Sequence, residues 1–220
     1  MGVHWTRDQD FYFHQAKHEG YRARSVYKLQ EIQQKFHILK PGIVAVDLGA
    51  APGSWTQYLA EVLGPNGVVV SVDRTPLAKP LPPQVRDICG DIFDVTEERL
   101  RDLAGGLADV VCSDMAPNTS GVKQVDHLRS IGLCERAMWI ADRLLKPGGD
   151  FIAKMFQGGD VQSYLRDLKV RYTEVKVFKP KSSKAESKET FVIARGFKGA
   201  PASTERELPP TGGYDPLADR

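Results

Sequence analysis

The chain has 220 residues, of which 41% are hydrophobic and 26% are charged, and its formal net charge is +2. This length suits one α/β domain with a tail rather than two domains of ordinary size. No apolar run approaches the roughly 18 residues of a membrane span, and residues 1–8 lack the apolar core of a signal peptide. We therefore expect a cytoplasmic protein that acts as a monomer and has no membrane partner.

Charge is distributed unevenly along the chain. Residues 1–40 carry seven Lys or Arg against four Asp or Glu, and residues 176–198 carry seven against two. Between them, residues 41–175 carry fourteen basic against eighteen acidic side chains. The two basic segments are either ordinary solvated surface or two parts of one surface for a phosphate backbone.

Cysteine and histidine give no sign of a metal centre. Cys89, Cys112 and Cys134 are widely spaced, without a C-x-x-C pair, which is typical of reduced thiols in a core. His14 and His18 lie one helical turn apart, but no third ligand accompanies them. We expect no metal cofactor.

The predicted elements begin with two helices, over 8–19 and 24–37, which form an N-terminal helical extension with basic residues over 1–40. Strands and helices then alternate. Strands are predicted over 43–47, 68–73, 85–89, 108–113 and 149–155, and helices over 54–63, 96–104, 126–146 and 160–169. This βαβ rhythm predicts an α/β, Rossmann-like domain with a mostly parallel sheet covered on both faces.

The pattern changes near the C-terminus. Two strands, 173–178 and 190–194, are joined by the polar loop 179–188, which predicts an antiparallel hairpin that completes a seven-stranded sheet. Lys146-Pro147-Gly148-Gly149 predicts a turn after the long helix. The α/β domain therefore covers 41–198. Residues 199–220 are rich in Pro, Gly and small polar residues and are predicted to be a disordered tail.

The run from Val46 to Trp55 joins an apolar strand to a glycine turn and a helix start. Gly49 and Gly53 allow close backbone approach to a ligand. Ala51 stands where the dinucleotide fingerprint G-x-G-x-x-G has its middle glycine, which disfavours an NAD-dependent oxidoreductase. A compact cationic ligand such as S-adenosylmethionine fits this turn better.

Aspartates follow successive predicted strands, where ligands of open parallel sheets bind. Asp47 ends the first strand, and Asp73 ends the second, where a carboxylate can accept both ribose hydroxyls. Asp91 is placed to meet an adenine amino group, and Asp114 follows the strand over 108–113. Any single Asp can simply belong to a turn, but four at strand ends favour a ligand site. Trp55 packs on the ligand or anchors its helix, and we favour the former.

Two further strings carry a resemblance to a known family, Ser113-Asp114-Met115-Ala116-Pro117-Asn118 and Ala153-Lys154-Met155-Phe156-Gln157-Gly158. A lysine that ends a buried strand is costly unless it is paired or functional. With Tyr27-Lys28-Leu29, Ser187-Lys188-Glu189-Thr190 and the glycine turn, the chain resembles the FtsJ/RrmJ family of ribose 2′-O-methyltransferases from about Tyr21 to Lys198.

The resemblance implies methyl transfer from S-adenosylmethionine at a tetrad of Lys28, Asp114, Lys154 and Glu189. It places the cofactor contacts at Gly53, Trp55, Asp73, Asp91 and Asp114. A ribose hydroxyl needs a base or a group that stabilises the developing alkoxide. Our hypothesis is that Lys154 is that base, that Asp114 and Lys28 position it and the ribose, and that Glu189 orders the network. No metal is needed.

The same resemblance implies an RNA substrate. Tyr21-Arg22-Ala23-Arg24-Ser25 and Lys179-Pro180-Lys181-Ser182-Ser183 resemble the bacterial 23S rRNA enzymes, so we expect a uridine of large-subunit rRNA as target and rRNA within the large ribosomal subunit as partner. The residues expected to hold RNA phosphates are Arg22, Arg24, Lys35, Lys179, Lys181 and Lys184. The alternatives are a tRNA ribose methyltransferase, a small-molecule methyltransferase, and a non-catalytic RNA-binding ribosome-assembly factor.

Overall fold

The computed structural model describes residues 7–117, 121–156, 158, 161–184 and 187–199. The predicted disordered tail, 199–220, lies outside these residues, apart from Gly199 at its start. The helices are α1 (Arg7–His18), α2 (Val26–Phe36), α3 (Ser54–Leu63), α4 (Glu97–Ala104), α5 (Lys123–Leu144) and α6 (Val161–Arg171). The strands are β1 (Val44–Leu48), β2 (Val68–Asp73), β3 (Val85–Cys89), β4 (Ala108–Ser113), β5 (Leu145–Phe156), β6 (Tyr172–Phe178) and β7 (Glu189–Phe197).

The strands form one seven-stranded sheet in the order β3-β2-β1-β4-β5-β7-β6. The neighbours from β3 to β5 are parallel, whereas β7 is antiparallel to both β5 and β6. The predicted α/β class, the mostly parallel sheet and the C-terminal antiparallel hairpin are confirmed. The sequence order reverses between β1 and β4, which is where open α/β sheets bind ligands.

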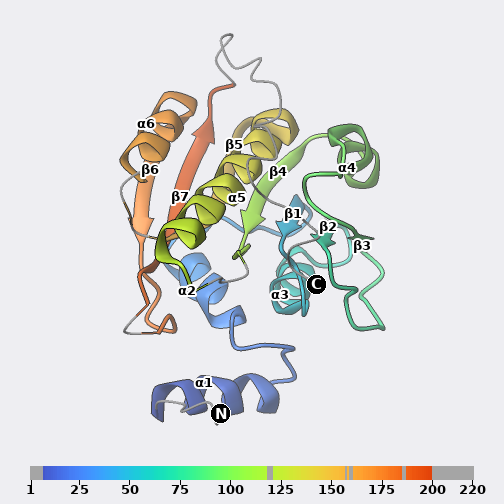
Figure 1. Ribbon diagram of the computed structural model, residues 1–220. Helices are drawn as coiled ribbons and strands as arrows, with labels where there is room; N and C mark the ends of the chain where they lie inside the picture. The colour runs from blue at the N-terminus through green and yellow to red at the C-terminus, as the bar shows by residue number, and fades with distance from the viewer. Residues whose placement is uncertain (1–6, 118–120, 157, 159–160, 185–186, 200–220) are drawn as a thin grey trace.

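Helices cover both faces of this sheet (Figure 1). One core cluster joins the sheet to α4, α5 and α6, and a second joins it to α2 and α3. Alternate residues of β1 supply the two clusters, since Val46 and Leu48 belong to the first and Ala45 to the second. The strands are apolar on both faces because both faces are covered.

Residues 146–149, predicted as a turn that precedes a strand, lie inside strand β5. The structure runs β5 from Leu145, and the pairing register moves from Ala108 opposite Leu145 to Val110 opposite Asp150. Residues 146–149 therefore form a bulge opposite a single residue, Asp109. Lys146 Nζ lies 2.9 Å from both carboxylate oxygens of Asp109, which fastens the bulge to β4.

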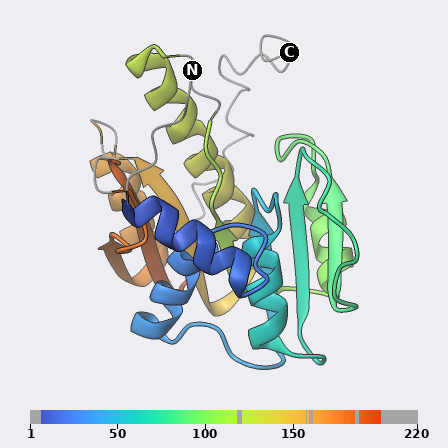
Figure 2. The same ribbon diagram turned by 90° about the horizontal axis from the view of Figure 1, so that it is seen from below.

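The parallel strands all end toward the side of the molecule where α1 and α2 lie (Figures 1 and 2). The view in Figure 2 looks at this side, and α1 crosses in front of the sheet there. The loop between β6 and β7 reaches the same side and contacts α2. No helix in the described ranges is both long and apolar enough to cross a bilayer.

Candidate active site

A cavity of about 350 Å³ lies beyond the carboxyl ends of β1, β2 and β4. Its acidic lining residues are Asp73, Asp91 and Asp114, so the structure brings together three of the four predicted strand-end aspartates. The lining also includes Arg74 and Thr75, backbone of the glycine turn, and apolar side chains, Ile92, Phe93, Met115 and Leu133 among them. Carboxylates beside an apolar wall suit a ligand that combines cationic or hydroxyl groups with a flat ring.

The glycine turn brings backbone to the rim of the cavity. Gly49 has φ +79°, and a Cβ added there would lie 2.6 Å from Met115 Cγ, so only glycine fits both the backbone and the space. Gly53, with φ +104°, precedes the first residue of α3 and lies outside the lining. The Arg22 guanidinium occupies the space a Gly53 side chain would need.

Backbone donors hold two of the cavity carboxylates in place. Asp73 Oδ2 accepts from the Ala51 N–H at 2.9 Å and Oδ1 accepts from the Thr75 N–H at 2.8 Å, which ties the glycine turn to the end of β2. Asp91 Oδ1 accepts from the Phe93 N–H at 2.9 Å. Because an ionised carboxylate has about four acceptor sites, both groups retain capacity for ligand donors.

Asp47 lies beneath the cavity rather than in its wall. Its side chain is fully buried, and Thr56 Oγ1 donates to its Oδ2 at 2.6 Å. Burial raises the pKa of Asp47 to about 7, with further upward contributions from the charges of Asp114 and Asp73, against a lowering by the Thr56 hydrogen bond. The side chain does not line the cavity and instead joins β1 to α3, and the expected contact of Asp47 with the ligand stays a prediction.

Trp55 lies in the core of the protein. Its side chain is buried, its indole N–H donates to the Ser25 carbonyl at 2.8 Å, and its ring centroid lies 5.7 Å from that of Phe191. The ring belongs to the core between α3 and the sheet and does not line the cavity. The structure supports its role as a helix anchor, and the expected contact of Trp55 with the ligand stays a prediction.

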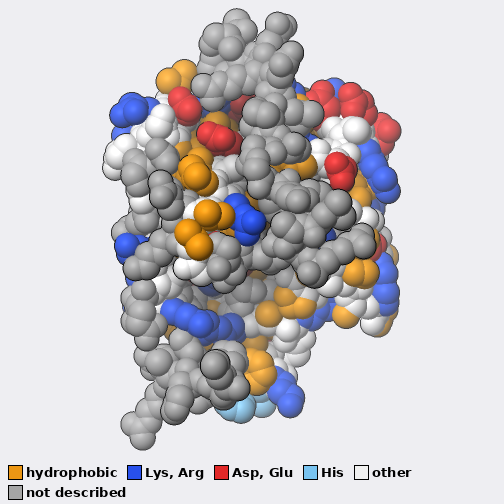
Figure 3. All heavy atoms as spheres, in the orientation of Figure 1, with side chains coloured by type: hydrophobic (Ala, Val, Ile, Leu, Met, Phe, Trp, Pro, Cys, Tyr) orange, Lys and Arg blue, Asp and Glu red, His pale blue; other side chains and the backbone are white. Residues whose placement is uncertain are grey.

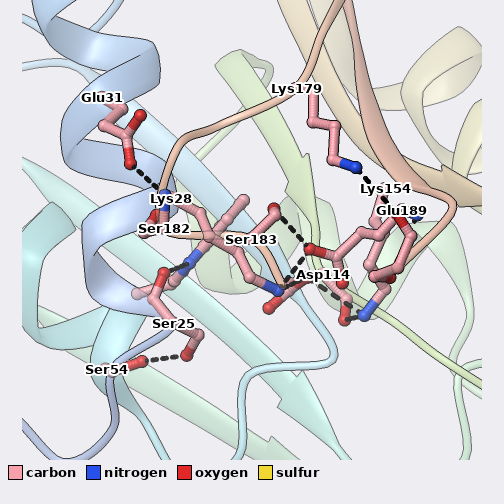
Figure 4. A network of polar contacts seen from close by, with 12 residues as sticks. Ser25, Lys28, Glu31, Ser54, Asp114, Lys154, Lys179, Ser182, Ser183 and Glu189 are labelled. Atoms are coloured by element: carbon pink, nitrogen blue, oxygen red, sulfur yellow. Dashed lines mark hydrogen bonds and ion pairs between the residues drawn. The ribbon is translucent and has the colours of Figure 1, made fainter. Parts of the chain in front are cut away.

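Four charged side chains from four parts of the chain meet beside the cavity (Figure 4). Asp114 Oδ1 lies 3.1 Å from Lys154 Nζ and 3.7 Å from Lys28 Nζ. Lys28 Nζ lies 2.8 Å from Glu189 Oε1, and Lys154 Nζ also donates to the Asp114 carbonyl. The sequence-predicted tetrad is one connected network, and Asp114 belongs to both the network and the cavity wall.

Lys154 is buried and Lys28 is half-buried, and both are paired. Lys154 is 8% exposed on β5, where it stands opposite Phe191 of β7. Lys28, on α2, lies 5.7 Å from the centroid of the same Phe191 ring. Two ammonium groups with two carboxylates leave the cluster formally neutral, which offsets much of the cost of removing the four groups from water.

Two residues that support the tetrad were missed from the sequence. Glu31, one turn after Lys28 on α2, accepts from the backbone N–H groups of Lys181 and Ser182 at 2.7 and 2.9 Å. Ser183 Oγ then donates to Glu189 Oε1 at 2.8 Å. The β6–β7 loop is thereby clasped onto the helix that carries Lys28. The i, i+3 spacing of Lys28 and Glu31 was the only local signal.

Arg136 was also missed, because an arginine in a long helix reads as surface charge. Its side chain is buried, and its guanidinium donates to the carbonyls of Ile92 and Val95, each at 2.9 Å. Burial lowers the pKa of Arg136 to about 10. These bonds fix the segment after Asp91 that forms the apolar wall of the cavity.

The predicted RNA-binding residues lie around α2 and the β6–β7 loop. Arg22 donates to the Pro80 carbonyl at 2.9 Å, Lys35 Nζ lies 4.6 Å from the Phe178 ring centroid, and Lys179 donates to the Ser187 carbonyl at 2.8 Å. Lys181 and Lys184 are exposed, and Arg24 is half-buried. Their role in RNA binding stays a prediction.

Within the described ranges, no group of three or more His, Cys, Asp or Glu side chains is arranged to hold a metal ion. Cys89, Cys112 and Cys134 are free thiols, and the last two are buried. Burial raises the pKa of Cys134 to about 12.

Comparisons with known proteins agree on one family. Residues 21–197 match the model of the FtsJ-like methyltransferases. A ribosomal RNA large subunit methyltransferase E from Oleidesulfovibrio alaskensis is 48% identical over 90% of this chain and 97% of its own, and one from Methanothrix thermoacetophila is 49% identical over 89% and 76%. A crystal structure from Plasmodium falciparum, provisionally described as a ribosomal RNA methyltransferase, has a TM-score of 0.72 at 28% identity and covers 81% of this chain and all of its own.

Proposed function

This chain belongs to the FtsJ-like methyltransferase family, and from that premise we propose that it methylates the 2′-hydroxyl of a uridine in large-subunit rRNA, with S-adenosylmethionine as methyl donor. The observation that carries the proposal is the position of Asp114. Its side chain lines the cavity and pairs with both lysines of the buried tetrad. Asp114 therefore connects the cavity proposed for the methyl donor with the tetrad proposed to handle the proton of the acceptor.

The cavity fits the proposed cofactor by its chemistry. Asp73 ends β2 and would accept from ribose hydroxyls, while Asp91 would accept from an adenine amino group whose ring packs against Ile92 and Phe93. A Cβ at Gly49 would clash with Met115, so glycine lets the turn lie close to this part of the cavity wall. S-adenosylmethionine supplies an electrophilic methyl group on a sulfonium centre.

The tetrad handles the acceptor. A ribose hydroxyl is a weak nucleophile until its proton is removed, and Lys154 in its uncharged form accepts that proton as the oxygen attacks the methyl carbon. Lys154 would hold that proton beside Asp114, so that the positive charge supplied with the donor's methyl group would be balanced at the tetrad. Asp114 holds the Lys154 ammonium at 3.1 Å, while Lys28, paired with Glu189, orients the ribose oxygen. Orientation in line with the methyl group then lowers the barrier.

Large-subunit rRNA as the substrate is supported by the relatives named above, which match most of this chain at 48–49% identity. The basic residues near the site supply the phosphate contacts that any RNA substrate requires. The relevant partner is rRNA within the large ribosomal subunit.

Two substitutions test the proposal by separating its halves. In Lys154→Ala we expect methyl incorporation into large subunits from cells lacking the gene to fall at least about 100-fold, the usual contribution of a general base. Calorimetry should find its affinity for S-adenosylmethionine within about twofold of the wild type, since Lys154 does not line the cavity. In Asp73→Ala, cofactor affinity itself should fall.

Mapping the methylated ribose identifies the substrate. A 2′-O-methylated uridine in 23S rRNA that disappears without the gene supports the proposal. Methylation lost from a tRNA anticodon loop instead would overturn the substrate assignment, and near-normal turnover in Lys154→Ala would overturn the mechanism.

A further inference from the structure

Helix α1 leaves aromatic side chains in water at the active-site side of the molecule. Phe11 is 63% exposed and Phe13 is 47% exposed, although a phenylalanine ring gains free energy by leaving water. The matched family region begins at residue 21, so α1 precedes it. No part of the mechanism above uses this helix.

The other face of α1 explains how the helix is held. Ala16 is buried, and Tyr12 packs against Tyr27 of α2 with ring centroids 5.4 Å apart. At 100° per residue, positions 12 and 16 share one face, positions 14, 17 and 18 lie on the opposite side, and positions 11 and 13 stand at the two edges between them. Phe11 and Phe13 therefore border the outward side of a helix that is anchored on its other face.

Basic residues accompany the exposed rings. Lys17, His14 and His18 are exposed on the same outward part of α1. The one acidic residue between positions 11 and 24 is Glu19, and both its carboxylate oxygens already accept hydrogen bonds, from Gln15 and from the Tyr27 hydroxyl. Figure 3 shows Lys, Arg, His and hydrophobic side chains gathered at this lower end. Exposed rings on a segment with a surplus of basic residues, seven Lys or Arg against four Asp or Glu over residues 1–40, complement a single-stranded polyanion whose bases are unstacked.

The position of α1 relative to the tetrad completes the argument. α2 carries both Tyr27, which packs on α1, and Lys28, which belongs to the tetrad. In Figure 2 the helix crosses the side on which the parallel strands end. A strand of RNA that delivers a ribose to Lys154 would continue directly over this helix.

We propose that the outward side of α1, with Phe11 and Phe13 at its two edges and His14, Lys17 and His18 between them, binds unpaired nucleotides that flank the target ribose, with the two phenylalanine rings as stacking platforms. This inference rests on the proposed function for its RNA partner. It adds a second contact region that selects single-stranded over duplex RNA, because paired bases cannot expose their faces to a protein ring.

The test uses the full-length protein and two fluorescein-labelled probes, a 20-nucleotide oligouridylate and an RNA duplex of the same length. In Phe11→Ala/Phe13→Ala we expect the affinity for oligouridylate, measured by anisotropy, to fall about tenfold or more, as for the loss of base stacking. Duplex affinity should change less than threefold. Phe11→Trp/Phe13→Trp, which keeps a stacking ring at each position, should restore oligouridylate binding.

A matched control removes an exposed apolar side chain elsewhere. Val170 on α6 is 60% exposed, and Val170→Ala should bind both probes as the wild type does. Equal melting temperatures of the variants show that α1 still packs on α2. In methylation assays the phenylalanine variant should raise KM for rRNA and leave kcat nearly unchanged.

Three results would overturn the inference. These are unchanged oligouridylate affinity in the phenylalanine variant, an equal loss for oligouridylate and duplex, and a change confined to oligomeric state in sedimentation, which would assign the rings to a second copy of the chain. The proposed function fails differently, through absence of methyl transfer with α1 intact. Weakened oligouridylate binding without any rRNA methylation would retain the α1 surface and refute the activity.

Discussion

Replacing Asp47 by asparagine should change how the stability of this protein depends on pH. Asp47 is completely buried between β1 and α3, where Thr56 donates to one carboxylate oxygen and the other has no hydrogen-bond partner. Burial raises its pKa from 3.8 to about 7. The folded protein thus holds this proton more tightly than the unfolded chain between about pH 4 and pH 7.

The magnitude follows from this difference. At roughly 1.4 kcal/mol per pH unit, ionised Asp47 costs the folded state about 4 kcal/mol relative to the protonated form. The stabilisation of the folded state by protonated Asp47 is fully present below 3.8, the pKa of Asp47 in the unfolded chain, and is lost as the pH rises through about 7. Between pH 5 and pH 8.5 the wild type should lose about 3 kcal/mol of unfolding free energy through this group alone.

Urea denaturation of wild type and Asp47→Asn at pH 5, 7 and 8.5 measures the difference. Asparagine keeps an oxygen for Thr56 and cannot ionise, so the variant should gain about 3 kcal/mol relative to wild type over that interval. Asp102→Asn, a change at an exposed carboxylate on α4, controls for loss of a negative charge. Parallel pH profiles for Asp47→Asn and wild type would refute a buried, proton-holding Asp47.

Two further predictions concern packing and pairing. Gly49→Ala should lower the free energy of unfolding by about 1–3 kcal/mol and weaken binding of S-adenosylmethionine in calorimetry, because the added Cβ would lie 2.6 Å from Met115 and the φ of +79° disfavours alanine. Binding of S-adenosylmethionine at wild-type affinity would contradict the close contact between Gly49 and Met115. Asp142→Ala should cost about 3–5 kcal/mol in urea denaturation, because it leaves the Arg171 guanidinium, now 2.8 Å from the carboxylate, buried without its partner. Asp142→Leu/Arg171→Met should recover most of that loss, and a double variant as unstable as the single one would contradict this account.

The sequence predicted the secondary structure correctly where the pattern depends on residues that are near one another in the chain. Apolar runs and helical spacings predicted how strands and helices alternate along the chain. The change of pattern after residue 170 predicted the antiparallel hairpin that the structure contains. Lys146 to Gly149 shows the limit of such patterns. The turn residues are where they were expected, but pairing with β4 continues on both sides of them, which only the neighbouring strand decides.

The site divides in the same way. Gly49, Asp73 and Asp91 were identified because a ligand at a strand end needs turn glycines and acceptors next to apolar runs. Trp55 and Asp47 belong to the same motif by sequence, yet their side chains point into the core, where one anchors α3 and the other holds Thr56. The direction of a side chain at a helix start depends on the residues that pack against the helix. Sequence spacing alone therefore did not separate the residues that line the cavity from the residues that anchor α3.

The sequence by itself therefore determined the α/β sheet, the glycine turn and the acids at the strand ends, because backbone sterics and hydrophobic periodicity act between near neighbours in the chain. Only the tertiary structure decided that Glu31 clasps the β6–β7 loop, that Arg136 shapes the cavity wall, and that α1 turns its phenylalanines outward beside the site. Those arrangements arise where distant segments share one buried volume, and the hydrogen bonds they make are set by packing across the sheet rather than along the chain.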